Sequence, residues 1–123
     1  MSDLNTILII DDSSLSRMLI RRMVLSKFPN CSVIEASNGD EALNVAVPAA
    51  PDLITIDINM PGMSSFDAAR LLREKYPSAK MAVITANIQN TVRQKIQSLG
   101  ILFLAVIEKP LTENNMQKIF DAC

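Results

Sequence analysis

The chain has 123 residues, of which 49% are hydrophobic and 20% charged, and its formal net charge is −1 at pH 7. This length suits one domain, and this composition is typical of a globular fold rather than a disordered chain. No basic stripe and no apolar run of membrane-spanning length are visible, which argues against direct nucleic-acid binding and against a membrane segment. We therefore expect a single domain over residues 1–123 with a cytoplasmic location.

Histidine is absent, and the two cysteines, Cys31 and Cys123, form no CxxC pair. The first feature excludes histidine bases and nucleophiles and most zinc sites, and the second argues against a disulfide or a thiolate metal site. Any divalent metal would be held by oxygen ligands, which favours Mg²⁺ or Mn²⁺.

Strand-like and helix-like segments alternate five times along the chain. The strand candidates are rich in Ile, Val and Leu without clean polar alternation, which is typical of strands covered on both faces of a parallel sheet. In chain order, the pattern predicts strand 6–10, helix 14–27, strand 32–36, helix 39–47, strand 52–57, helix 64–75, strand 80–85, helix 88–98, strand 103–108 and helix 112–122. Right-handed connections between the strands then predict a doubly wound α/β sandwich.

Capping and breaking residues mark the ends of the predicted helices. Ser13 or Ser14 can cap the first helix with a side-chain oxygen. Pro48 stops the second helix, Pro77 closes the third, and Gly100 ends the fourth.

The first predicted helix carries apolar residues on more than one face. These residues are Leu15, Met18, Leu19, Ile20, Met23, Val24 and Leu25. One interpretation is a wide core-facing surface, and the other is a surface that binds a partner protein. Both interpretations stay open at the level of sequence.

Polar residues suited to phosphoryl chemistry stand at the ends of four predicted strands. Asp11 and Asp12 follow the first strand, Asp57 ends the third, Thr85 ends the fourth, and Lys109 follows the fifth. The carboxyl ends of parallel strands meet at one edge, where open α/β sheets bind ligands, so we expect these side chains to lie together. Crowded carboxylates repel each other unless a cation intervenes, which points to Mg²⁺.

In this interpretation each side chain has a separate role. A carboxylate oxygen of Asp57 can attack phosphorus and form an aspartyl phosphate. The negative oxygens of the transferred group would be balanced by Mg²⁺, by Lys109 and by the Thr85 hydroxyl. Each residue alone has a plain structural explanation, as a helix cap, a strand end or a solvated charge. Their combination at four strand ends favours function.

These residues, in this order and spacing, resemble the receiver domains of two-component response regulators, the CheY-like superfamily. The resemblance covers essentially the whole chain and rests on the motifs Ile-Ile-Asp11-Asp12-Ser13, Ile-Asp57-Ile-Asn59-Met60-Pro61-Gly62-Met63, Ile-Thr85-Ala86 and Glu108-Lys109-Pro110. It implies a flavodoxin-like (βα)5 fold whose five-stranded parallel sheet has the order 2-1-3-4-5. It also implies a cis peptide bond between Lys109 and Pro110.

The resemblance further implies a phosphoacceptor signalling domain rather than a turnover enzyme. Asp57 would take a phosphoryl group from a histidine kinase or phosphotransfer protein in a Mg²⁺-dependent reaction. Asp12 would bind the metal with help from Asp11 and Asp57, and the backbone carbonyl of Asn59 would be a further ligand. Thr85 and Lys109 would contact the phosphoryl oxygens. A downstream protein target and a phosphatase complete the implied partners.

The chain departs from the family pattern near the start of the third helix and around the fifth strand. Receivers usually carry Gly at the position of Ser65, and Tyr or Phe three residues before the lysine, where this chain has Val106. The segment from Gly100 to Lys109 is also longer than usual. We therefore expect a switch without a moving aromatic ring, carried by the loop after Thr85 and by the fourth helix.

The longer segment predicts an output face of unusual shape. Ile101, Phe103 and Leu104 are either partly exposed there for a partner or simply fill the core. The sequence does not decide between these two interpretations.

Other functions fit the sequence less well. A phosphohydrolase of the haloacid-dehalogenase type would carry an acid two residues after its nucleophile, and Asn59 stands there. A flavin or nucleotide binder would need a glycine-rich loop, but the chain has only 3 glycines. A phosphorylation-independent interaction module on the same fold is the remaining alternative.

Overall fold

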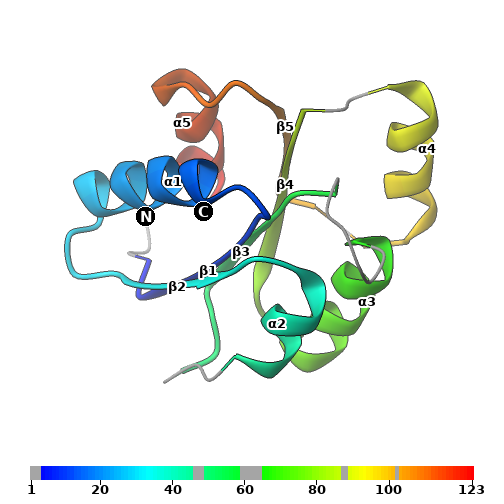
Figure 1. Ribbon diagram of the computed structural model, residues 1–123, viewed down its shortest axis with the longest axis horizontal. Coiled ribbons are helices and arrows are strands. Elements are labelled where there is room, and N and C mark those ends of the chain that lie inside the picture. The colour runs from blue at the N-terminus through cyan, green and yellow to red at the C-terminus, as the bar shows by residue number, and fades with distance from the viewer. Residues whose placement is uncertain (1–3, 46–48, 59–64, 87–88, 102) are drawn as a thin grey trace.

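The computed structural model contains one sheet of five parallel strands in the order β2-β1-β3-β4-β5, flanked by five helices (Figure 1). The residues that it describes are 4–45, 49–58, 65–86, 89–101 and 103–123. The strands are β1 Thr6–Ile10, β2 Ser32–Ala36, β3 Leu53–Ile56, β4 Lys80–Thr85 and β5 Ala105–Glu108. The helices are α1 Ser14–Lys27, α2 Gly39–Asn44, α3 Ser65–Lys75, α4 Asn90–Ser98 and α5 Glu113–Ala122. The predicted fold class and strand order are therefore confirmed.

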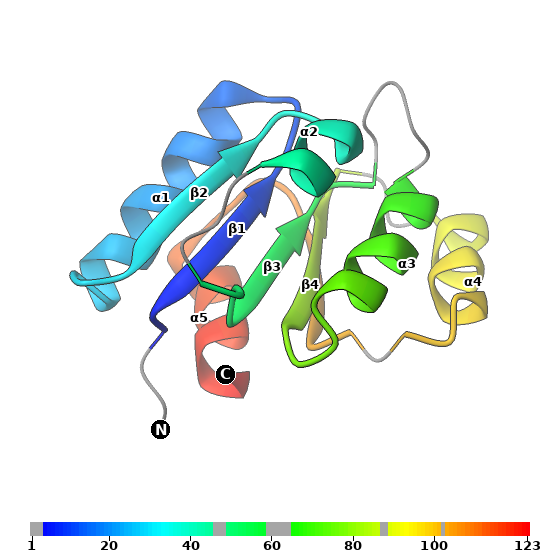
Figure 2. The ribbon, with the colours of Figure 1, turned by 90° about the horizontal axis from the view of Figure 1, so that it is seen from below.

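Helices cover both faces of the sheet, so the molecule has three layers. Figures 1 and 2 show α1 and α5 on one face and α2, α3 and α4 on the other. Alternate residues of β1 point to opposite faces, as the period of a strand requires. Ile7 and Ile9 pack with the α1–α5 core, whereas Leu8 and Ile10 pack with the core beneath α2, α3 and α4. Burial on both faces explains why the strands lack polar alternation.

Several predicted boundaries coincide with the structure, and others differ by a few residues. The α1 helix begins after Ser13, whose side chain accepts a hydrogen bond from the Ser16 N–H, so the first of the two candidate caps is used. The α2 helix ends at Asn44 rather than at residue 47, because Val45 has already turned to an extended backbone with ψ 138°. The predicted helix starts at residues 64 and 88, and the predicted stop residue Pro48, lie outside the described residues.

The fifth strand begins at Ala105 rather than at residue 103. Gly100 ends α4 in the left-handed region, with φ 69°, which favours glycine because it lacks a Cβ atom. The chain then reaches the sheet where the Leu104 N–H donates to the Met81 carbonyl of β4 at 2.7 Å. Ile101 and Phe103 in this connection are half-buried, and both pack at the margin of the core beneath α3 and α4.

The α1 helix has a buried face and an exposed apolar face. Ile20 and Val24 lie in the core, whereas Leu15 is 60% exposed and Met18 is 46% exposed. The wide-core interpretation therefore does not account for every apolar residue of this helix. None of the described helices has the length and apolar character needed to cross a membrane.

Candidate functional site

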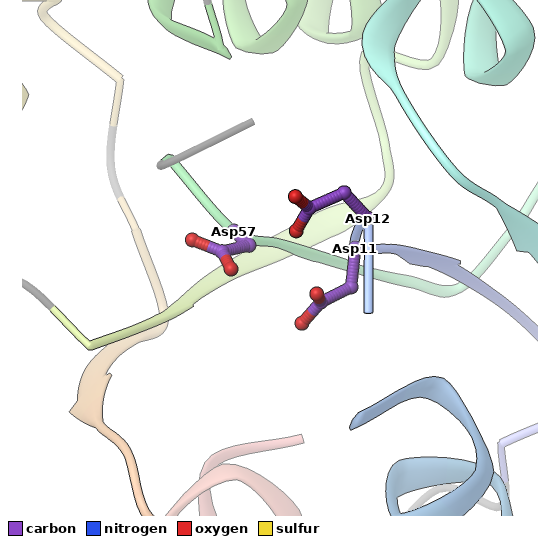
Figure 3. Close-up of side chains that lie close together, drawn as sticks. All are labelled: Asp11, Asp12 and Asp57. Atoms are coloured by element: carbon purple, nitrogen blue, oxygen red, sulfur yellow. The ribbon is translucent and has the colours of Figure 1, made fainter. Parts of the chain in front are cut away.

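Three aspartates meet at the carboxyl edge of the sheet (Figure 3). One carboxylate oxygen each from Asp11, Asp12 and Asp57 lies within 4.8 Å of the others. Asp11 and Asp12 follow β1, and Asp57 follows β3, which pairs directly with β1 and has Ile56 in register with Ile10. Adjacent parallel strands thus bring these carboxylates together, as the sequence pattern predicts.

Asp11 is buried and held at several atoms. Its side chain is 1% exposed, with Oδ1 accepting the Ser13 N–H at 2.9 Å and Oδ2 accepting a hydrogen bond from Lys109 at 2.9 Å. Burial raises the pKa of this carboxyl above its ordinary value, and the nearby charge of Asp57 acts in the same direction. The bonds from Ser13 and Lys109 oppose this shift without cancelling it. Asp11 therefore ionises less readily than a surface aspartate.

Lys109 joins two of the carboxylates. Its Nζ atom lies 2.9 Å from Oδ2 of Asp11 and 3.0 Å from Oδ2 of Asp57. Burial alone would lower the pKa of this amine, but the hydrogen bonds and charges of the two aspartates outweigh burial and leave the pKa raised. Lys109 therefore remains a cation across the physiological pH range and offsets part of the repulsion between the carboxylates.

Thr85 is connected to Lys109 through the backbone. Thr85 ends β4 with its side chain fully buried, and its carbonyl accepts the Lys109 N–H at 2.9 Å. The following Lys109–Pro110 peptide bond is cis, as the resemblance predicts. All five predicted side chains thus stand at one edge of the sheet, whereas Asn59 lies outside the described residues.

The comparison with known protein families agrees with this geometry. The family model described as the response regulator receiver domain matches residues 7–121 of the chain. The chain belongs to the response regulator receiver family.

Curated relatives of this receiver domain are longer proteins. It is 36% identical over 105 residues to the protein-glutamate methylesterase/protein-glutamine glutaminase 1 of Syntrophus aciditrophicus, matching 85% of this chain and 30% of that protein. It is 39% identical over 83 residues to the nitrate/nitrite response regulator protein NarL of Escherichia coli K12, matching 67% of this chain and 38% of that protein. The chain thus spans well under half the length of these relatives.

Solved structures share the fold over almost the whole receiver domain. The chemotaxis protein CheY4 of Vibrio cholerae superposes with a TM-score of 0.81 at 24% identity, covering 96% of this chain and 97% of that chain. The response regulator protein TrrA of Thermotoga maritima, solved in complex with Mg²⁺ and BeF, gives a TM-score of 0.78 at 26% identity. That match covers 97% of this chain and 99% of the TrrA chain.

The donor set of this receiver domain suits a hard divalent cation. Asp11, Asp12 and Asp57 offer carboxylate oxygens, the ligands that Mg²⁺ prefers, and the described group contains no thiolate or imidazole. Asp12 is exposed, whereas the other two aspartates are buried, so the group opens to solvent on one side. A small hydrated cation can therefore enter without displacing core side chains.

One further group contacts the site and has no counterpart among the predicted residues. Nη1 of Arg17 donates to the backbone carbonyl of Asp11 at 2.5 Å, and Nε of Arg17 donates to Oε1 of Glu35 at 3.1 Å. Arg21, one turn further along α1, donates to Oε2 of the same glutamate at 3.4 Å. Nothing in the sequence pattern singles out Arg17, because its acceptor is a backbone atom and its charge partner lies on β2.

Proposed function

We propose that this receiver domain accepts a phosphoryl group on Asp57 and thereby acts as a signalling switch. The observation that supports this function most directly is the arrangement of the carboxylates and the amine. The ligand oxygens of Asp11, Asp12 and Asp57 lie within 4.8 Å of one another, and Lys109 bonds to the two buried ones. Such a site can bind a divalent cation and hold a phosphoryl group beside it.

In the proposed reaction, a carboxylate oxygen of Asp57 attacks the phosphorus of a phosphohistidine. A new P–O bond forms, the P–N bond breaks, and the leaving imidazole takes the bonding electron pair and then a proton. Lys109 already lies 3.0 Å from Asp57, so its amine can move from the carboxylate to an oxygen of the transferred group. We assign the Thr85 hydroxyl a hydrogen bond to another of these oxygens.

Mg²⁺ fits this scheme as the cation held by the three aspartates. When bound, it neutralises charge on the carboxylates and on the phosphoryl oxygens. The complex of the relative TrrA with Mg²⁺ and BeF supports the choice of metal. We include the backbone carbonyl of Asn59 in the ligand set by family resemblance, and Mn²⁺ has the same preference for oxygen ligands.

A histidine kinase or phosphotransfer protein is the proposed phosphodonor, and a downstream protein is the proposed target. The exposed residues Leu15 and Met18 lie in the first two turns of α1, which follows the Asp11–Asp12 pair in the chain, and they are three residues apart on one helix face. This small apolar surface, Leu15 and Met18, is suited to contact a helical donor whose phosphohistidine must reach Asp57. In this scheme the chain turns over no substrate of its own.

Phosphorylation from a small donor tests the proposal without the partner. The purified chain with acetyl phosphate and Mg²⁺ should gain one phosphoryl group, measured by intact mass, and peptide mapping should place it on Asp57. Asp57→Asn should abolish the gain because an amide is a poor nucleophile. Asp40→Asn, which changes an exposed aspartate of α2, should leave the gain unchanged.

Two results would contradict the proposal. Equal labelling of wild type and Asp57→Asn would exclude Asp57 as the acceptor. A wild-type chain that stays unlabelled under these conditions, while still folded by circular dichroism, would favour the phosphorylation-independent interaction module.

A further inference from the structure

Arg17 is the charged residue of α1 that reaches the acidic edge of the sheet. Its side chain is only 18% exposed, compared with 47% for Arg21 on the same helix. Its guanidinium spans two acceptors at once, with Nη1 on the Asp11 carbonyl and Nε on Glu35. Because the guanidinium is planar and rigid, fixing one of its ends on Glu35 also fixes the direction of the other.

The Asp11 carbonyl belongs to the peptide unit that leads into Asp12. A peptide unit is planar, so a bond that holds this carbonyl also sets the orientation of the Asp12 N–H and of the Asp12 Cα atom. Asp11 is otherwise anchored through its N–H to the Ala36 carbonyl at 3.1 Å and through its carboxylate to Ser13 and Lys109. Asp12 is exposed, so core packing does not hold its side chain. The orientation of its backbone therefore largely determines where its carboxylate lies.

We infer that Arg17 is a positioning residue of the metal site, which holds the Asp11–Asp12 peptide so that the Asp12 carboxylate points at the cation. Glu35 in turn aligns the guanidinium of Arg17. This inference rests on the proposed Mg²⁺-dependent function, but it concerns a bond that exists before the cation arrives. Residues that orient metal ligands in this way commonly change metal affinity by roughly tenfold or more when they are removed.

The charge of Arg17 and its position predict opposite changes in Mg²⁺ affinity when Arg17 is replaced. A guanidinium near a cation site repels the cation, so removing its charge should strengthen Mg²⁺ binding if electrostatics alone mattered. If Arg17 holds the Asp12 peptide, removing it should weaken Mg²⁺ binding. Arg21 supplies the matched control, because it carries the same charge on the same helix and contacts the same Glu35, and its described hydrogen bond goes to that glutamate.

The experiment is a Mg²⁺ titration of the full chain without any phosphodonor, followed by ¹H–¹⁵N amide shifts. We expect Arg17→Gln to raise the dissociation constant roughly tenfold and Arg21→Gln to change it by less than about twofold. In the metal-free protein, the Asp12 amide shift should depart from its wild-type value more in Arg17→Gln than in Arg21→Gln. A purely structural role would lower the melting temperature without this difference in metal affinity.

Each outcome bears on the inference separately from the function. The inference is overturned if the Mg²⁺ dissociation constant of Arg17→Gln equals that of the wild type or is lower. The proposed function stays intact in that case, provided that the wild type binds Mg²⁺. A wild type that does not bind Mg²⁺ contradicts the proposed function itself. If Arg17→Gln fails to fold, Arg17→Lys replaces it, since lysine keeps the charge but has one nitrogen in place of the two that donate to Glu35 and to the Asp11 carbonyl. A wild-type Mg²⁺ affinity and a wild-type Asp12 amide shift in Arg17→Lys would then overturn the inference.

Discussion

Asp11 is a buried carboxylate placed where the proposed chemistry needs a charge. Its side chain is 1% exposed, and burial raises its pKa. The ionised form is therefore less stable in the folded metal-free protein than in the unfolded chain. Metal binding would supply the positive charge that the ionised form lacks. Asp11 thus lowers the stability of the metal-free fold, and the same carboxylate can bind a cation.

We predict that Asp11→Asn stabilises the metal-free protein and removes its response to Mg²⁺. The neutral amide avoids the cost of burying a charge, while Lys109 keeps its bond to Asp57. The gain should be about 1 kcal/mol at pH 7, the usual scale of a single substitution. Urea unfolding with and without Mg²⁺ measures both effects. Asp40→Asn is the control, and a destabilised Asp11→Asn protein would contradict the assignment of burial as the dominant cause.

The pH dependence of this gain has a definite sign. A carboxyl whose pKa is raised on folding favours the folded state most when it is protonated, and this contribution is lost as the pH rises through the folded-state pKa. The stability difference between Asp11→Asn and wild type should therefore be small below the ordinary value of 3.8 and grow toward neutral pH. Unfolding curves of both proteins across this range, without metal, test the sign.

At the scale of residues, the sequence predicts the side chains that carry charge at strand ends and does not predict what holds them. Asp11, Asp12 and Asp57 follow from strand polarity, because parallel strands place their carboxyl ends together. Arg17 does not follow, since its bond to the Asp11 carbonyl depends on how α1 leaves β1, and its bond to Glu35 depends on the register between α1 and β2. One sequence contains no direct signal of that register.

The α1 helix combines a structural face with an exposed apolar face. Ile20 and Val24 anchor it on the sheet, and Leu15 and Met18 are exposed in the first two turns, shortly after Asp11 and Asp12 in the chain. Exposed apolar pairs of this size are common on surfaces, so the proposed role of this pair rests on its place at the start of the helix that follows Asp11 and Asp12. Its proposed role is to contact the protein donor.

We predict that the double substitution Leu15→Ser, Met18→Ser slows phosphotransfer from a protein donor but not phosphorylation by acetyl phosphate. Both side chains are exposed, so the free energy of unfolding should change by less than about 0.5 kcal/mol. Leu71→Ser removes a third exposed apolar residue, on α3, and is the matched control. A phosphohistidine protein from the same organism serves as donor. If the double substitution slowed phosphorylation equally with the protein donor and with acetyl phosphate, the substitutions would act on the aspartate site and not on the surface formed by Leu15 and Met18.

At the scale of elements, the sequence predicts correctly the helix and strand ends that carry strong local signals. It predicts wrongly the ends that are set by tertiary contacts. The α1 helix begins at Ser14, as predicted, because Ser13 supplies a local cap. The start of β5 is set by where the chain meets β4, at the Leu104–Met81 hydrogen bond, which no local pattern encodes. The same holds for the early end of α2.

Across the whole molecule, burial is uneven. The α3 helix buries four of its residues, whereas α4 buries Ile96 alone among its nine described residues. Elements with few buried apolar contacts open locally at low free energy, and such elements are commonly the ones that move in switching. Val106 of β5 is half-buried and carries no ring, so movement of an aromatic side chain at this position cannot drive the proposed switch.

We predict that amide hydrogen exchange in the unmodified protein is faster in α4 than in α3. Adding Mg²⁺ and beryllofluoride, which mimics the phosphoryl group, should slow exchange in α4 more than in any other helix. Mass spectrometry of peptic fragments measures all elements in one experiment, and Asp57→Asn with the same reagents is the control. The switch that we expect would be contradicted by α4 exchange that stays constant while β5 becomes protected.

The ion pair between Lys109 and Asp11 joins residues 98 positions apart in the chain. One partner follows the first strand in the chain and the other follows the last, so the pair forms only after β5 has joined the sheet. A nascent, truncated or misfolded chain therefore lacks the complete acidic site. Under the proposed function, a phosphorylated chain therefore shows two things. The donor protein has transferred its phosphoryl group, and the accepting chain has been fully synthesised and folded.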